Sequence, residues 1–74
     1  MNKVISKLFV AIRYDDRKVV YFDTNLKSFI DGCHAKANIS GLKGLSYYQY
    51  TFRNQETIHH VDSFGKMFYL QKVF

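Results

Sequence analysis

Apolar and polar residues alternate along most of this chain, and only one stretch has the spacing of an α-helix. In residues 4–13, Leu8, Val10 and Ile12 alternate with the residues between them. A repeat of two is typical of a β-strand, because successive side chains point to opposite faces. Turn-forming residues follow at 14–18, and residues 18–23 are again β-branched and apolar. The sequence therefore predicts a β-hairpin over residues 4–23.

The stretch from Asp23 to Asn38 differs from the rest of the chain. Its apolar residues lie on one face of a helix, at Leu26, Phe29, Ile30, Cys33 and Ala37. Asp23 or Thr24 can accept hydrogen bonds from the first backbone N–H groups, and Asn38 tolerates the left-handed conformation that ends many helices. We therefore predict one amphipathic helix, followed by a glycine-containing loop over residues 39–44.

Three more strands are predicted after this loop, over residues 45–52, 57–61 and 66–74. Short connections favour antiparallel neighbours, and one amphipathic helix covers only one face of a sheet. The predicted fold is therefore a two-layer α+β domain, in the element order β-β-α-β-β-β. It consists of an antiparallel five-stranded sheet with one helix. With 74 residues, the chain forms a single small domain over residues 1–74.

The face of the predicted sheet without a helix is the feature that bears on function. From the alternation, we expect the helix-covered face to carry Leu8, Val10, Ile12, Val20, Phe22, Tyr48, Tyr50, Phe52, Phe68 and Leu70. The opposite face would then carry Lys7, Phe9, Arg13, Val19, Tyr21, Tyr47, Gln49, Arg53, Met67, Tyr69 and Gln71. From this second group we select as binding residues Arg13, Tyr21, Tyr47, Gln49, Arg53 and Tyr69.

Three interpretations of that face compete. It is an ordinary surface with scattered apolar side chains, or it contacts a protein, or it contacts a nucleic acid. Protein contact includes association with a second copy, since twofold dimers are the commonest oligomers. In a nucleic-acid complex, the rings of this face would stack on bases, and Arg13, Lys7 and Lys72 would contact phosphates. A formal net charge of +5 is compatible with nucleic-acid contact. However, no RNA-recognition, helix-turn-helix or zinc-finger pattern occurs in the sequence.

No motif in the sequence carries catalytic or cofactor chemistry. Adjacent residues such as His59 and His60 point to opposite faces of a strand, and neighbouring helix residues such as Cys33 and His34 do not face each other. We therefore expect no enzyme activity, no metal and no cofactor. The single cysteine favours a reducing, cytoplasmic setting. No apolar stretch has the roughly 18–20 residues of a membrane span, so no membrane partner is expected.

Taken together, these features favour a small basic protein-interaction module, either a homodimer or a binder of another protein, that acts as an accessory or modulator. The alternative is a nucleic-acid-binding protein that uses the same face.

Overall fold

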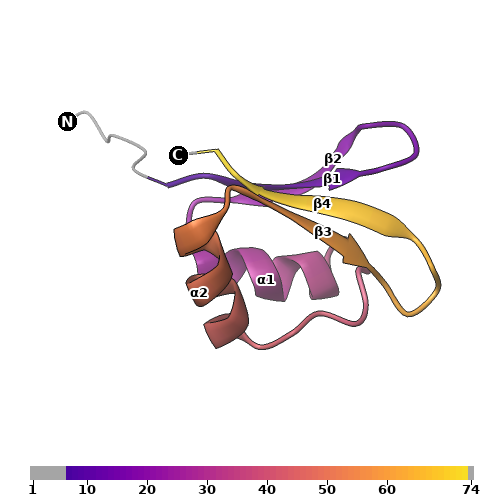
Figure 1. Cartoon of the computed structure of the whole chain (residues 1–74). Coiled ribbons are helices and arrows are strands. Elements are labelled where there is room, and N and C mark those ends of the chain that lie inside the picture. Colours follow the sequence, from indigo (N-terminus) through magenta and orange to yellow (C-terminus); the bar gives the residue numbers. More distant parts are fainter. Residues whose placement is uncertain (1–6, 74) are drawn as a thin grey trace.

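The computed structural model describes residues 7–73, which form two β-hairpins separated by two helices (Figure 1). The elements are β1 (Phe9–Arg13), β2 (Val19–Asp23), α1 (Leu26–Ala35), α2 (Leu45–Asn54), β3 (Thr57–Val61) and β4 (Met67–Lys72). The strands form a four-stranded sheet in the order β2-β1-β4-β3, and all neighbours are antiparallel. The first strand of one hairpin therefore pairs with the last strand of the other at the centre of the sheet.

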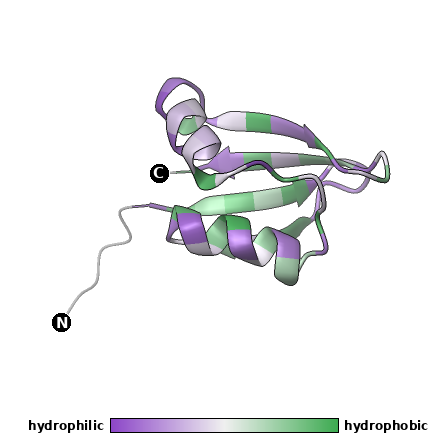
Figure 2. Ribbon diagram, turned by 90° about the horizontal axis from the view of Figure 1, so that it is seen from below, coloured by the Kyte–Doolittle hydropathy of each residue, from purple (hydrophilic) through white to green (hydrophobic). Residues whose placement is uncertain are grey.

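Both helices lie against the same face of this sheet (Figure 1). The chain is thus a small two-layer α+β domain, but the prediction of five strands with one helix is wrong. Helix α1 carries hydrophobic and hydrophilic stretches in turn (Figure 2), as expected for an element with one buried side. The parts of the predicted terminal strands at residues 4–6 and at Phe74 lie outside the described residues.

The segment predicted as the third strand is the helix α2. Tyr48 and Phe52 are buried, with 1% and 4% of their surface exposed, whereas Tyr50 is 69% exposed. Burial at positions i and i+4, with i+2 in solvent, is the pattern of a helix. The spacing of the aromatic residues in this segment fits both periods, and their β-propensity favoured the strand. Packing decided the outcome, because α2 buries Tyr48 and Phe52 in the core beneath the sheet.

The two sides of β1 are the reverse of the predicted ones. Phe9 and Ala11 are buried towards the helices, while Val10 and Ile12 are half-buried on the other side. Val10 pairs with Phe22, but a bulge between Ala11 and Ile12 shifts the register, so that Ile12 pairs with Val19. Because β1 carries apolar residues at both sets of alternate positions, its period could not show which set would be covered.

Helix α1 begins and ends close to the predicted residues. The side chain of Asn25, not that of Asp23 or Thr24, accepts the capping hydrogen bond from the backbone N–H of Ser28, at 3.1 Å. After the helix, Asn38 adopts the left-handed conformation with φ 57°, as predicted. The turn is closed by a hydrogen bond from the N–H of Ile39 to the carbonyl of Cys33, at 2.9 Å.

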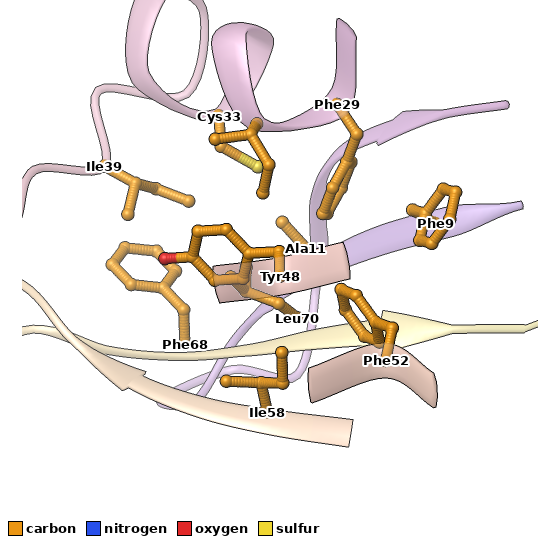
Figure 3. Packing of buried hydrophobic residues seen from close by; sticks show 11 residues of the cluster. Phe9, Ala11, Phe29, Cys33, Ile39, Tyr48, Phe52, Ile58, Phe68 and Leu70 are labelled. Atoms are coloured by element: carbon orange, nitrogen blue, oxygen red, sulfur yellow. The ribbon is translucent and has the colours of Figure 1, made fainter. Parts of the chain in front are cut away.

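The core fills the space between the sheet and the two helices (Figure 3). The ring of Phe9 lies 5.7 Å from that of Phe29 and 5.4 Å from that of Phe52, measured between centroids. Tyr48 carries the one phenol in this cluster, and its hydroxyl accepts a hydrogen bond from the N–H of Lys43 at 3.0 Å. Contacts between β1, α1 and α2 therefore hold both helices on one side of the sheet, and no helix formed by residues 7–73 lies on the other side.

Candidate interaction surface

The sheet face that points away from the helices is called the open face. Its positions alternate with the buried residues and are neighbours across the strands, as in the pairing of Tyr69 with both Ile12 and His59. The open face consists of Val10, Ile12, Val19, Phe22, Thr57, His59, Val61, Met67, Tyr69 and Gln71. None of these strand positions carries an Asp, Glu, Lys or Arg.

The most exposed apolar side chains of the open face lie on its two edge strands. Phe22 on β2 is 64% exposed, and Val19 on β2 and Val61 on β3 are each 54% exposed. The central strands contribute the half-buried Val10, Ile12 and Met67 between them. An apolar surface thus runs across all four strands, and a contiguous patch of this kind commonly marks an interaction site.

The middle of the open face carries a cluster of rings from three elements. The ring of Tyr69 lies 5.3 Å from that of His59 and 5.7 Å from that of Tyr14, in the loop after β1. The guanidinium of Arg17 lies 4.7 Å from the ring centroid of Tyr14 and 5.5 Å from that of Tyr69. These are cation–π distances, so Arg17 already covers part of the ring surface that a stacking base would need.

The structure places three of the predicted binding residues near the sheet, but on different sides. Tyr69 lies on the open face, within the ring cluster. Tyr21 lies on the helix side of β2, where its ring is 6.2 Å from that of Phe29 and its hydroxyl donates to Asp23 at 3.1 Å. Loss of solvent around Tyr21, and then this hydrogen bond, raise the pKa of its phenol.

Arg13, at the end of β1, is held by a local ion pair. Its Nε and Nη2 atoms donate to the two carboxylate oxygens of Asp16, at 3.0 and 2.7 Å. The hydrogen bond from Arg13 lowers the pKa of Asp16 from 3.8 to about 2, and the N–H of Lys18 assists. Arg13 is therefore engaged within its own hairpin loop.

The other three predicted residues lie on α2, in the helical layer. Tyr47 is 43% exposed, and its ring meets that of Tyr48 edge-on, with the Nζ of Lys43 at 4.8 Å from its centroid. Gln49 and Arg53 line a recess beside the end of the sheet. The six predicted residues thus lie on several separate surfaces, and the single shared face that we expected for them is wrong because α2 is not a strand.

Sequence reasoning missed the other members of the ring cluster and the most exposed ring of the open face. Tyr14 and Arg17 lie in the loop after β1, where no periodicity applies, and His59 was considered only as a metal ligand. Phe22 was assigned to the covered side of the sheet. Val10, with which Phe22 pairs across the strands, was assigned to the same side, so both residues were misplaced together.

The two pairs of metal-capable residues noted in the sequence are separated by the fold. His59 is exposed on the open face, whereas His60 is buried, with its Nε2 at 2.8 Å from the carbonyl oxygen of Ser40. Cys33 is fully buried, and this burial raises the pKa of its thiol to about 12, while His34 is exposed. Residues 7–73 contain no cluster of three or more residues able to hold a metal ion.

We found no protein family, curated protein or solved structure that matches this chain. Among the described residues, no helix has the length and apolar character needed to cross a membrane. The fold and its surfaces therefore define a small α+β domain with two helices on one side of a four-stranded sheet and, on the other, an open face whose strand positions carry no Asp, Glu, Lys or Arg.

Proposed function

We propose that this protein is a small, non-enzymatic interaction module that pairs through its open face with a second copy of itself, as an accessory or modulator protein. The observation that carries the proposal is a largely apolar sheet face whose strand positions carry no Asp, Glu, Lys or Arg, in a chain with 11 Lys and Arg residues. The cores of protein interfaces are depleted of charged residues in this way, with their charges at the rim. The single buried cysteine supports a reducing, cytoplasmic setting for the module.

Charge favours the open face as the surface for self-association. Two copies that each carry a formal charge of +5 repel one another. Repulsion is weakest where the surfaces in contact carry no charge, which is the case for the strand positions of the open face. Twofold symmetry requires that both copies use the same surface, so an isologous pair would place Phe22 and Val61 of each copy against the open face of the other.

The size of the open face sets the expected strength of the contact. Four strands at about 4.8 Å spacing and five residues at about 3.4 Å rise give a footprint of roughly 300 Å². This is smaller than the ~800 Å² per partner of a standard interface, so neighbouring loops must contribute or the dimer is weak. We therefore expect a dimer that dissociates on dilution.

The same surface supports nucleic acid less well. Phosphate contacts need cationic side chains, and the one nearest the ring cluster, Arg17, is stacked on Tyr14 and Tyr69. Of the cations expected to serve that role, Arg13 is paired with Asp16, and Lys7 and Lys72 line the recess on the helical side. These positions favour protein over nucleic acid as the partner of the open face.

Light scattering coupled to size-exclusion chromatography tests the proposal, over a dilution series at low and high salt. The wild-type chain should run as a dimer at high concentration and as a monomer when dilute. Added salt should leave the dimer intact or strengthen it, because it screens the repulsion between the copies. Phe22→Lys and Val61→Lys should each give a monomer, since each places a charge in the contact.

Tyr50→Lys is the matched control for Phe22→Lys. Tyr50 is 69% exposed, close to the 64% of Phe22, but it lies on α2 in the helical layer. This variant should dimerise like the wild type, and circular dichroism should show that all three variants are folded. The proposal fails if the wild type is monomeric at every concentration, if Phe22→Lys still dimerises, or if Tyr50→Lys separates the copies equally. A monomer that binds an oligonucleotide in a salt-sensitive way would establish the alternative.

A further inference from the structure

A recess on the helical side of the molecule has the features of a ligand site that is separate from the open face. It has a volume of about 500 Å³, within the ~300–1,000 Å³ range of small-molecule sites. Its apolar lining comes from Phe9 of β1, Leu26 of α1 and Phe52 of α2. Phe9 and Phe52 belong to the packed core, so the floor of the recess is fixed by the fold.

The polar lining of the recess is cationic. Lys7, Arg53 and Lys72 come from three distant parts of the chain and meet here, together with the amide of Gln49. Among residues 7–73, no Asp or Glu lines the recess, and the only salt bridge is that of Arg13 with Asp16. Like charges that converge without a carboxylate repel one another, so this arrangement has an electrostatic cost that a bound anion would offset.

The end of helix α2 accounts for part of this positive charge, because its dipole is stabilised by cations. The Nζ of Lys72 donates to the carbonyl oxygen of Phe52 at 3.2 Å, and Arg53 lies in the last turn of α2. Cations stabilise the negative end of a helix dipole, which is equivalent to about half an elementary charge. Three cationic side chains exceed that half charge, and an excess of positive charge remains at the mouth of the recess.

We propose that this recess binds a small organic phosphate monoester. A phosphate monoester carries close to two negative charges at neutral pH, which matches the cationic excess better than a single carboxylate. The guanidinium of Arg53 is suited to paired hydrogen bonds with phosphate oxygens. The organic group of the ester then packs on Leu26 and on the small exposed parts of Phe9 and Phe52, which are 3% and 4% exposed.

Amide NMR titrations with three probes test this inference: phenyl phosphate, inorganic phosphate and phenol. Phenyl phosphate should shift the amide signals of residues around Leu26, Gln49, Arg53 and Lys72. It should bind at least about tenfold more tightly than inorganic phosphate, which lacks the ring, and than phenol, which lacks the charge. The Lys7→Gln/Arg53→Gln double variant should weaken phenyl phosphate binding by about tenfold or more.

The Lys36→Gln/Lys66→Gln double variant is the control, because it removes the same two charges from exposed positions outside the recess. It should change the affinity by less than about twofold, since distant exposed charges are screened. The inference is overturned if this control weakens binding as much as the recess variant, if inorganic phosphate binds as well as phenyl phosphate, or if the shifts map elsewhere. Phe22→Lys should bind phenyl phosphate normally, so the outcome is independent of dimer formation.

Discussion

Gly32 is the position where one methyl group should reveal how α1 is seated on the sheet. A Cβ at Gly32 would lie closer than 3.0 Å to the Cζ, Cε2 and hydroxyl oxygen of Tyr21. In an isolated helix, Gly→Ala is stabilising by about 1 kcal/mol. Here the added methyl group cannot be accommodated unless the Tyr21 ring moves by about 1 Å or more to reach an ordinary contact distance.

The magnitude follows from what the ring would lose. Its pairing with Phe29, at 6.2 Å, contributes about 0.5–1.5 kcal/mol. The hydrogen bond from its hydroxyl to Asp23, at 3.1 Å, contributes about the same amount. Against the gain of about 1 kcal/mol in helix propensity, Gly32→Ala should lower the free energy of unfolding by about 0–2 kcal/mol. In a Tyr21→Ala background, the same change should raise it by about 1 kcal/mol.

Urea denaturation followed by circular dichroism measures both effects in a double-mutant cycle over Tyr21 and Gly32. The expected coupling energy is about 1–3 kcal/mol, which is typical of residues in direct contact. The slope of the unfolding free energy against urea concentration should be the same for all four proteins of the cycle. Equal slopes would show that each protein exposes the same amount of surface on unfolding. If Gly32→Ala stabilises the wild type and the Tyr21→Ala variant equally, the close approach of α1 to β2 is refuted.

Two further predictions concern ionisable groups. Because the pKa of Asp16 is lowered from 3.8 to about 2, its ion pair should stabilise the fold above about pH 4 and lose this effect as the pH falls towards 2. An NMR titration of the carboxyl group should show this, and in Arg13→Gln the pKa should return most of the way to 3.8; an unchanged pKa would contradict the role of Arg13. Burial of Cys33 raises the pKa of its thiol to about 12, so a disulfide reagent should modify it only when the protein unfolds. Rapid modification of the folded protein at neutral pH would contradict this burial.

The cationic recess brings together basic residues that are far apart in the sequence. The basic residues are dispersed along the chain, and their positions in the sequence do not show whether any of them meet. In the structure, the end of β4 brings Lys72 beside α2, where it contacts the carbonyl of Phe52. Lys7 and Arg53 reach the same recess. Long-range pairing of β1 with β4 produces this meeting, and no local pattern encodes it.

Local patterns were sufficient for several elements. The first hairpin, α1 and the strands at 57–61 and near 67–72 were all predicted, because each has a clear period and flanking turn or capping residues. Asn38 is a further example, since its left-handed conformation follows from a local preference of its own side chain. For the part of the chain that the structure describes, one face of the sheet lacks a helix as expected, although the residues of that face were assigned wrongly.

The sequence by itself determined the α+β class and the location of the periodic elements, because these depend on side-chain spacing along the chain. Only the tertiary structure decided that residues 45–54 form a helix, and which side of β1 is covered. In both segments apolar residues satisfy two patterns at once, so their local preferences are balanced. Burial of rings from distant segments decided between them: with α2 as a helix and Phe9 of β1 turned towards it, the ring of Phe9 contacts those of Phe29 and Phe52.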